Sequence, residues 1–337
     1  MSMWYEQETL DNSSIISSRV RLARNLAAYP FSVQLGYEKS CAIIDEISVP
    51  LSDEYMFIAL DKEDKITRLS MLEAHEISPD VLKSGVERPF ALLKSHDRPA
   101  SIMLGEEDHI RIQAIAAGNN LDEAYAQAKE VDERLESLVN YAYHKDFGYL
   151  TSCPTNTGTG LRASFMVHIP MIEKTGSLPN LVKNLSKLGL TVRGIYGEGS
   201  NPCGSIYQVS NQVTLGKSES EIIEQIKTIG AQLIESEQAL LQSAFTKSQT
   251  DMEDVIYRAI GLLSHARKLA LNETMESLSA IKVGLLSGVL KKGVCSSPVY
   301  AIMIAIQPGN IQKKAGSHLS DRDIEIYRAR YLRKIFG

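Results

Sequence analysis

Apolar and polar positions follow two different patterns along the chain, and the change comes near residue 216. Before it, short apolar or alternating segments are separated by turn residues and are typical of strands. Strands are predicted at residues 101–104, 110–115, 164–169, 191–195 and 206–215. Apolar positions at helical spacing predict helices over 121–144 and 180–188. This pattern favours an antiparallel sheet flanked by helices.

After residue 216 the helical period dominates. Helices are predicted over residues 219–241, 251–271 and 277–290. We place a domain boundary near residue 245, inside the polar stretch 243–250, although the helix over 219–241 also suits packing on the sheet. The prediction is an α+β fold, with a catalytic domain over 1–245 and a small all-helical C-terminal domain over 246–337.

Composition and charge narrow the classes of protein to which the chain can belong. The chain has 337 residues, 44% of them hydrophobic and 23% charged, with a net charge of −5. These values are typical of a soluble globular protein and do not favour nucleic acid or an anionic membrane as a partner. The first residues lack a secretory signal, and the longest strongly apolar run, 299–306, is too short to span a bilayer. Four cysteines without a C-x-x-C pair disfavour zinc and disulfides, so we expect a cytoplasmic protein.

Two glycine-containing segments come close to nucleotide-binding motifs without matching them. The sequence GKS at 216–218 resembles the end of a phosphate-binding loop, but Asn211 stands where the first glycine belongs. The sequence GTG at 158–160 follows CPTN rather than an apolar strand. We interpret Gly216 as a loop residue and Ser218 as the cap of the next helix.

Five arginines occupy strand-like or turn contexts in which a solvated charge is not the obvious choice. They are Arg19, Arg21, Arg111, Arg162 and Arg193. Strand alternation puts Arg19 and Arg21 on one face. Taken singly, each is more often a surface residue in a salt bridge. Together, five guanidinium groups at one place would neutralise a triphosphate.

Four segments around these arginines resemble, in order, the signature segments of the ATP:guanidino phosphotransferases, or phosphagen kinases. They read SSRVRLARN, GEEDHIRIQ, TSCPTNTGTGLRAS and VRGIYGEGS. The sequences RASFMVHIP and YGEGSNPCGSIYQVSNQVTLG and the helical extension are similar to the McsB-type branch, the bacterial protein arginine kinases. Small-molecule members carry a long helical N-terminal domain, whereas SSRVR begins here at residue 17.

The resemblance implies roles for individual residues. Glu107 and Glu198 would orient the guanidino group and remove its proton, and Cys153 would touch that group. Without the resemblance, both glutamates would be read as solvated carboxylates and Cys153 as a small packing residue. The resemblance places the following residues at the ATP site: Ser17, Ser18, Arg19, Val20, Arg21, His75, Arg111, Arg162, Ala163, Ser164, Phe165, Met166, Arg193, Gly194, Ile195, Tyr196, Gly197 and Glu198. We expect Mg²⁺ to be held mainly by phosphates and water, without a side-chain metal site.

The implied activity is ATP-dependent phosphorylation of arginine residues in proteins. The resemblance also implies an activator protein, a heat-shock repressor among the substrates, delivery of marked proteins to a Clp protease, and dimerisation through the helical domain. One departure concerns the R-D-x-x-R-A phosphoarginine motif of the branch, because Ile324 and Glu325 stand where its first Arg and Asp belong, and Arg322 lies two residues too early. The sequence therefore leaves open whether a phosphoarginine pocket exists, since a shift of the helix would let Arg322 take the place of that Arg. Two alternatives stay open: a kinase of free arginine, and a nucleotide-binding regulatory protein that acts through its helical tail.

Overall fold

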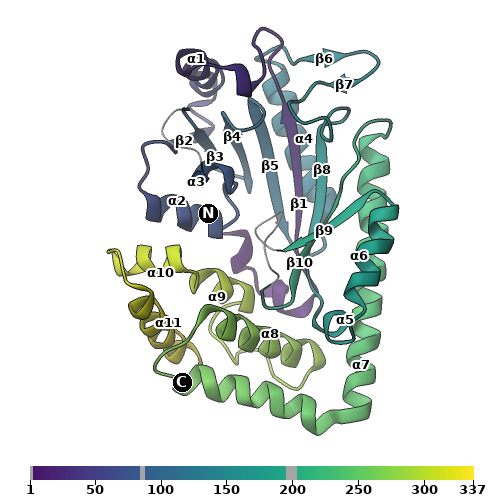
Figure 1. The fold of residues 1–337 in the computed structure, drawn as a ribbon, viewed down its shortest axis with the longest axis vertical. Helices are drawn as coiled ribbons and strands as arrows, with labels where there is room; N and C mark the ends of the chain where they lie inside the picture. The colour runs from purple at the N-terminus through teal and green to yellow at the C-terminus, as the bar shows by residue number, and fades with distance from the viewer. Residues whose placement is uncertain (1–2, 84–87, 195–202) are drawn as a thin grey trace.

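A single large antiparallel sheet organises the N-terminal two thirds of the molecule (Figure 1). The structure is a computed structural model that describes residues 3–83, 88–194 and 203–337. Within these residues the strand order is β2-β3-β4-β5-β1-β8-β10-β9, and β6 and β7 form a separate hairpin. The strands are β1 (Ile15–Arg24), β2 (Tyr55–Ala59), β3 (Ala91–Ser95), β4 (Ala100–Leu104), β5 (Ile110–Ala117), β6 (Tyr143–His144), β7 (Gly148–Tyr149), β8 (Leu161–His168), β9 (Leu190–Gly194) and β10 (Ile206–Asn211).

Helices cover one face of this sheet. The helices that precede the C-terminal region are α1 (Tyr37–Ser48), α2 (Lys65–Glu73), α3 (Asp80–Lys83), α4 (Leu121–Glu136), α5 (Pro170–Lys174) and α6 (Leu178–Lys187). Helix α4 packs on β1 and β5, and the first half of α7 (Glu219–His265) packs on β8 and β10. Their apolar faces bury Val20, Leu22 and Phe165 of the sheet in one core. The predicted α+β class, an antiparallel sheet flanked by helices, is confirmed.

Helix α7 joins the sheet to the helical C-terminal region. The predicted separation of two helices within the polar stretch 243–250 is confirmed, because α7 consists of two helices that meet at a kink at Ser248, whose backbone is not helical. Its start follows the prediction: the Ser218 hydroxyl accepts the N–H of Glu221, and the Glu221 carboxylate accepts the N–H of Ser218 at 2.7 Å. The later helices are α8 (Leu271–Ser287), α9 (Val299–Ala305), α10 (Pro308–Ala315) and α11 (Asp321–Phe336).

Several predicted elements end earlier than expected. The helix predicted over 121–144 ends at Glu136, and Tyr143 and His144 pair with β7 instead. The strand predicted over 206–215 ends at Asn211, whose side-chain amide donates to the Leu161 carbonyl at 2.9 Å. The local apolar pattern thus continues beyond the end of the element in both cases.

A second core lies between the sheet and the helical region. The short helices η1 (Trp4–Glu6) and η2 (Glu8–Asn12) lie there, between the sheet and helices α8 and α9 (Figure 1). Ile115 and Met166 from the sheet share this cluster with Tyr300 of α9. The two regions are thus joined by packed apolar side chains as well as by α7. No helix in the described ranges is long and apolar enough to cross a membrane.

Candidate active site

One face of the sheet carries the five arginines singled out by the sequence, and we call it the arginine face. Arg21 of β1 is the cross-strand partner of Arg162 of β8, and Arg111 of β5 pairs with Ala23. Arg193 of β9 pairs with Gln208 of β10. Because directly paired residues of antiparallel strands project to the same side, register places all five side chains on one surface.

Polar side chains of β10 hold two of these arginines. Arg19 Nη2 donates to Gln208 Oε1 at 2.8 Å, and Arg162 donates from Nε and Nη2 to Ser210 Oγ at 3.2 and 3.0 Å. Neither Gln208 nor Ser210 was predicted. Their positions in IYQVSN, two residues apart in a strand, were the available signal.

The charges on the arginine face repel one another. Arg21 and Arg162 lie directly opposite, an arrangement that destabilises a sheet unless an anion intervenes. Burial and the neighbouring arginines lower the pKa of Arg19 and, more strongly, that of Arg21. Arg111 forms an ion pair with the buried Glu106, which also accepts a hydrogen bond from Ser78. The donor set fits a polyanion with several oxygens, such as a triphosphate.

Some predicted nucleotide-site residues have side chains on the other face of the sheet. They are Ser18, Val20, Ala163 and Phe165. Phe165 is buried in the core, and the Ser18 hydroxyl donates to the Gly118 carbonyl at 2.7 Å. The cause is strand alternation, which sends every second residue to the opposite side. The side chains of Ser17, Ser164 and Met166 share the arginine face.

Glu107 lies in the turn between β4 and β5, at the Arg111 end of the arginine face. The turn needs glycine at position 105, because Gly105 has φ +84° and a side chain there would collide with the Pro89 carbonyl. Glu107 is exposed, while Glu106 and Asp108 on either side are buried. Surrounding protein atoms and the neighbouring Asp108 carboxylate raise the pKa of Glu107. A raised pKa makes this carboxylate a better proton acceptor.

The segment that contains Cys153 is tied to the Glu107 turn. The Ser152 N–H donates to Asp108 Oδ1, and the Ser152 hydroxyl donates to the Glu107 carbonyl, both at 2.7 Å. Cys153 is half-buried, with Sγ 3.0 Å from Thr155 Oγ1. Two segments 45 positions apart in sequence therefore form one unit.

The segment that carries the second predicted carboxylate, Glu198, lies only partly within the described residues. Arg193 and Gly194 end β9, and Gly194 pairs with Tyr207. The other predicted residues of this segment lie outside the described residues: Ile195, Tyr196, Gly197 and Glu198.

His75 lies beside the Arg19 end of the arginine face. Its Nε2 is 2.7 Å from the Tyr300 hydroxyl, and its carbonyl accepts a hydrogen bond from Gln113 at 2.8 Å. Burial, and to a smaller extent the Arg19 charge, lower its pKa to about 3, so the ring is neutral at ordinary pH. Trp4, Arg19 and His75 line a small space on this face together with Gln208.

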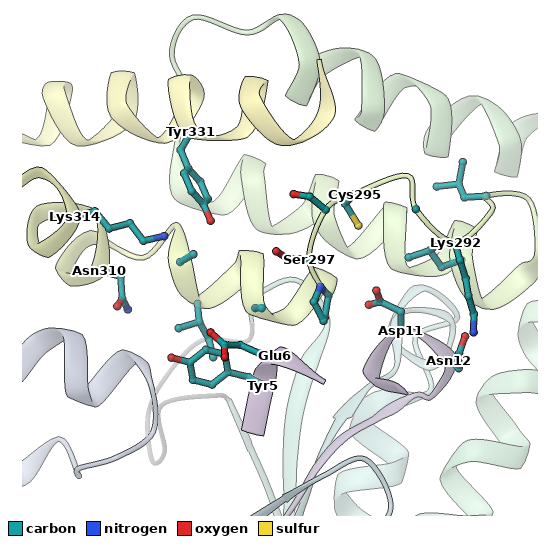
Figure 2. Close-up of a pocket in the computed structure, with 18 residues that line it drawn as sticks. Tyr5, Glu6, Asp11, Asn12, Lys292, Cys295, Ser297, Asn310, Lys314 and Tyr331 are labelled. Carbon is teal, nitrogen blue, oxygen red and sulfur yellow. The ribbon is translucent and has the colours of Figure 1, made fainter. Parts of the chain in front are cut away.

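A cavity of about 560 Å³ lies away from the arginine face, between the N-terminal segment and the helical region (Figure 2). Tyr5, Lys292, Cys295, Lys314 and Tyr331 contribute to its lining. It includes none of the predicted site residues. In the described part of the chain, no group of three or more His, Cys, Asp or Glu side chains is placed to hold a metal.

Comparison with known proteins adds independent information to this geometry. The family model "ATP:guanido phosphotransferase, C-terminal catalytic domain" matches residues 28–240, and "Protein-arginine kinase McsB C-terminal domain" matches residues 249–337. The chain belongs to the ATP:guanido phosphotransferase family. It is therefore an ATP-dependent phosphotransferase, and the family expectation from the four signature segments is confirmed. The interval between the two matches falls within α7.

Relatives match over nearly the whole chain. The protein-arginine kinase of Caldanaerobacter subterraneus subsp. tengcongensis is 40% identical over 329 residues, which is 96% of each chain. That of Bacillus subtilis is 38% identical over 342 residues, covering 99% of this chain and 93% of the relative.

Solved structures of phosphagen kinases share the fold. A duplicated taurocyamine kinase from Schistosoma mansoni, with bound transition-state analogue components, has a TM-score of 0.60 at 25% identity. The match covers 73% of this chain and 37% of that one. Lombricine kinase has a TM-score of 0.57 at 23% identity, covering 67% and 66% of the two chains.

Proposed function

We propose that this chain is a protein arginine kinase, which transfers the γ-phosphoryl group of MgATP to arginine side chains in proteins. The observation that carries the proposal is the arginine face, where Arg21 and Arg162 are direct cross-strand partners with Arg19 and Arg111 nearby. The protein-arginine kinases that match nearly the whole chain support the choice of acceptor.

The arginine face would bind and align the nucleotide. Arg19, Arg21, Arg111, Arg162 and Arg193 would contact the phosphates, and Mg²⁺ bound to those phosphates would supply further charge neutralisation. Because phosphoryl transfer has a loose, in-line transition state, holding the reacting groups in position is the main contribution of these side chains.

The Glu107 turn would act on the acceptor. A guanidinium nitrogen attacks poorly because its lone pair is delocalised, so the group must be oriented and lose a proton. Glu107 would accept that proton as the N–P bond forms and the bond from the γ-phosphorus to the ADP oxygen breaks. Glu198 would hold the guanidinium from the other side, and Cys153, tied to the turn through Ser152, would contact it.

The acceptor can be tested directly. The protein is incubated with γ-labelled ATP and Mg²⁺ and either free arginine or an unfolded protein; a matched protein with every arginine replaced by lysine is the control. We expect acid-labile label on the arginine-containing protein alone. Label only on free arginine would instead establish a small-molecule kinase. ATP binding without any transfer would favour the regulatory alternative.

The partners belong to the same proposal. We expect a cytoplasmic homodimer that associates through the helical region, responds to an activator protein, inactivates a heat-shock repressor and marks proteins for a Clp protease. This set follows from the resemblance to the protein arginine kinases, whose C-terminal domain model matches residues 249–337. Sedimentation at the mass of one chain at all concentrations would contradict the dimer.

A further inference from the structure

A tyrosine of the helical region reaches the arginine face. Tyr300, on α9, is buried, and its hydroxyl lies 2.7 Å from Nε2 of His75. The two rings are nearly parallel, with an interplanar angle of 10° and centroids 6.3 Å apart. These residues are 225 positions apart in the sequence, so the contact joins the two regions of the molecule directly.

His75 is held in a conformation that it would not adopt by itself. Its φ is +62°, in the left-handed region, which is strained for a non-glycine residue. Three contacts fix it there: Gln113 donates to its carbonyl, Tyr300 bonds its ring, and Trp4 packs beside it with ring centroids 6.3 Å apart. Strained residues of this kind persist where the surroundings determine them and are frequent at functional sites.

The His75 ring connects this tyrosine to the phosphate site. His75 and Arg19 line the same small space on the arginine face. The Tyr300 side chain, which comes from the helical region, therefore contacts one residue of the proposed nucleotide site that lies beside a second, Arg19.

We propose that Tyr300 is a positioning residue of the nucleotide site, holding the His75 ring beside Arg19 so that the helical region sets the affinity for MgATP. The inference rests on the proposed function, because it takes the arginine face as the site of the nucleotide phosphates. Tyr300 acts through His75 and takes no part in the transfer of the phosphoryl group. Its loss should therefore weaken nucleotide binding and leave the chemical step unchanged.

The test uses Tyr300→Phe, which removes the hydroxyl and keeps the ring. The chain has a single tryptophan, Trp4, with its ring centroid 5.6 Å from that of Tyr300, so its fluorescence can report MgATP binding. We expect the Kd and KM for MgATP to rise about tenfold, which corresponds to about 1.4 kcal/mol, with kcat within about twofold and an unchanged KM for the protein substrate. The matched control is Tyr257→Phe, on an exposed part of α7.

A second variant, at His75, tests whether Tyr300 acts through the His75 ring. Asparagine tolerates the left-handed backbone, so His75→Asn removes the ring with little added strain. If Tyr300 acts through His75, the double variant should bind MgATP as weakly as His75→Asn alone. Full additivity would overturn the proposal, and so would a Tyr300→Phe protein that binds MgATP like Tyr257→Phe.

The design separates this proposal from the function on which it rests. Should Tyr300→Phe fail to fold, His75→Asn carries the test, with weakened MgATP binding expected and unchanged binding contradicting the proposal. A wild-type protein that binds MgATP but transfers no phosphoryl group would contradict the proposed kinase activity, while the Trp4 titration would still decide the role of Tyr300.

Discussion

The Glu107 carboxylate is exposed at the end of the arginine face, between two buried acidic neighbours. Replacing it with glutamine removes the proton acceptor and keeps the shape of the turn. We expect Glu107→Gln to lower kcat roughly 100-fold to 10,000-fold, the usual contribution of a general base. MgATP binding should be nearly unchanged, because the arginines hold the phosphates. Initial rates with labelled ATP and a Trp4 fluorescence titration would measure the two quantities.

Glu133→Gln is the matched control for this change, since Glu133 is exposed on α4 and its side chain has no role in the proposed site. Its turnover should equal that of the wild type. If Glu107→Gln also turned over at the wild-type rate, another group would have to take the proton.

At the scale of single residues, the sequence predicted the positions of those side chains that follow from alternation within their own strand. The two-residue period placed Arg19 and Arg21 on one face without any structure. The same alternation places the side chains of Val20 and Phe165 on the opposite face. A sequence motif made of consecutive residues does not show this difference. Tyr300 could not be predicted, because its contact with His75 depends on how α9 packs against the sheet.

At the scale of elements, helix α7 approaches β8 very closely. A Cβ added to Gly230 would lie 2.5 Å from Cε2 of the buried Phe165 ring. We expect Gly230→Ala to destabilise the protein by about 1–3 kcal/mol through overpacking, partly offset by a gain of up to about 1 kcal/mol in helix propensity. Thermal and urea unfolding would measure the net effect as a lower Tm and a lower midpoint.

The same helix provides the control. Gly261 is exposed on α7, and nothing lies within 4 Å of an added Cβ. Gly261→Ala should therefore be neutral or slightly stabilising. Equal stability of the two alanine variants would show that the Phe165 ring moves aside without cost.

The helical period located both halves of α7 and the polar stretch between them. Within residues 243–250 the chain leaves the sheet and turns toward the C-terminal region (Figure 1). The break is shorter than predicted, because only Ser248 departs from helical geometry there, with φ −148° and ψ 54°. The ends of strands were predicted less well, since ladder partners rather than local pattern decide where a strand ends.

At the scale of the whole molecule, a buried carboxylate joins the sheet region to the helical region. Glu73, the last residue of α2, accepts the backbone N–H of Gly309 at 2.7 Å and that of Asn310 at 2.8 Å, at the start of α10. Burial raises the pKa of Glu73 to about 7, although these hydrogen bonds and the Arg328 charge oppose the rise. The junction between the two regions therefore carries a group that titrates near neutral pH.

The sign of the resulting pH dependence follows from this shift. Between the ordinary pKa of 4.5 and about 7, the folded protein keeps a proton that the unfolded chain has released. The contribution of Glu73 to stability is therefore complete below pH 4.5 and is lost as the pH rises through 7, by up to about 3 kcal/mol. We expect the Tm of the wild type, relative to Glu73→Gln, to fall between pH 5 and pH 8. Glu133→Gln is the control and should show no such trend relative to the wild type. If the Tm difference between the wild type and Glu73→Gln instead stayed constant or grew with pH, the N-terminus of α10 would have to stabilise the Glu73 carboxylate in its ionised form.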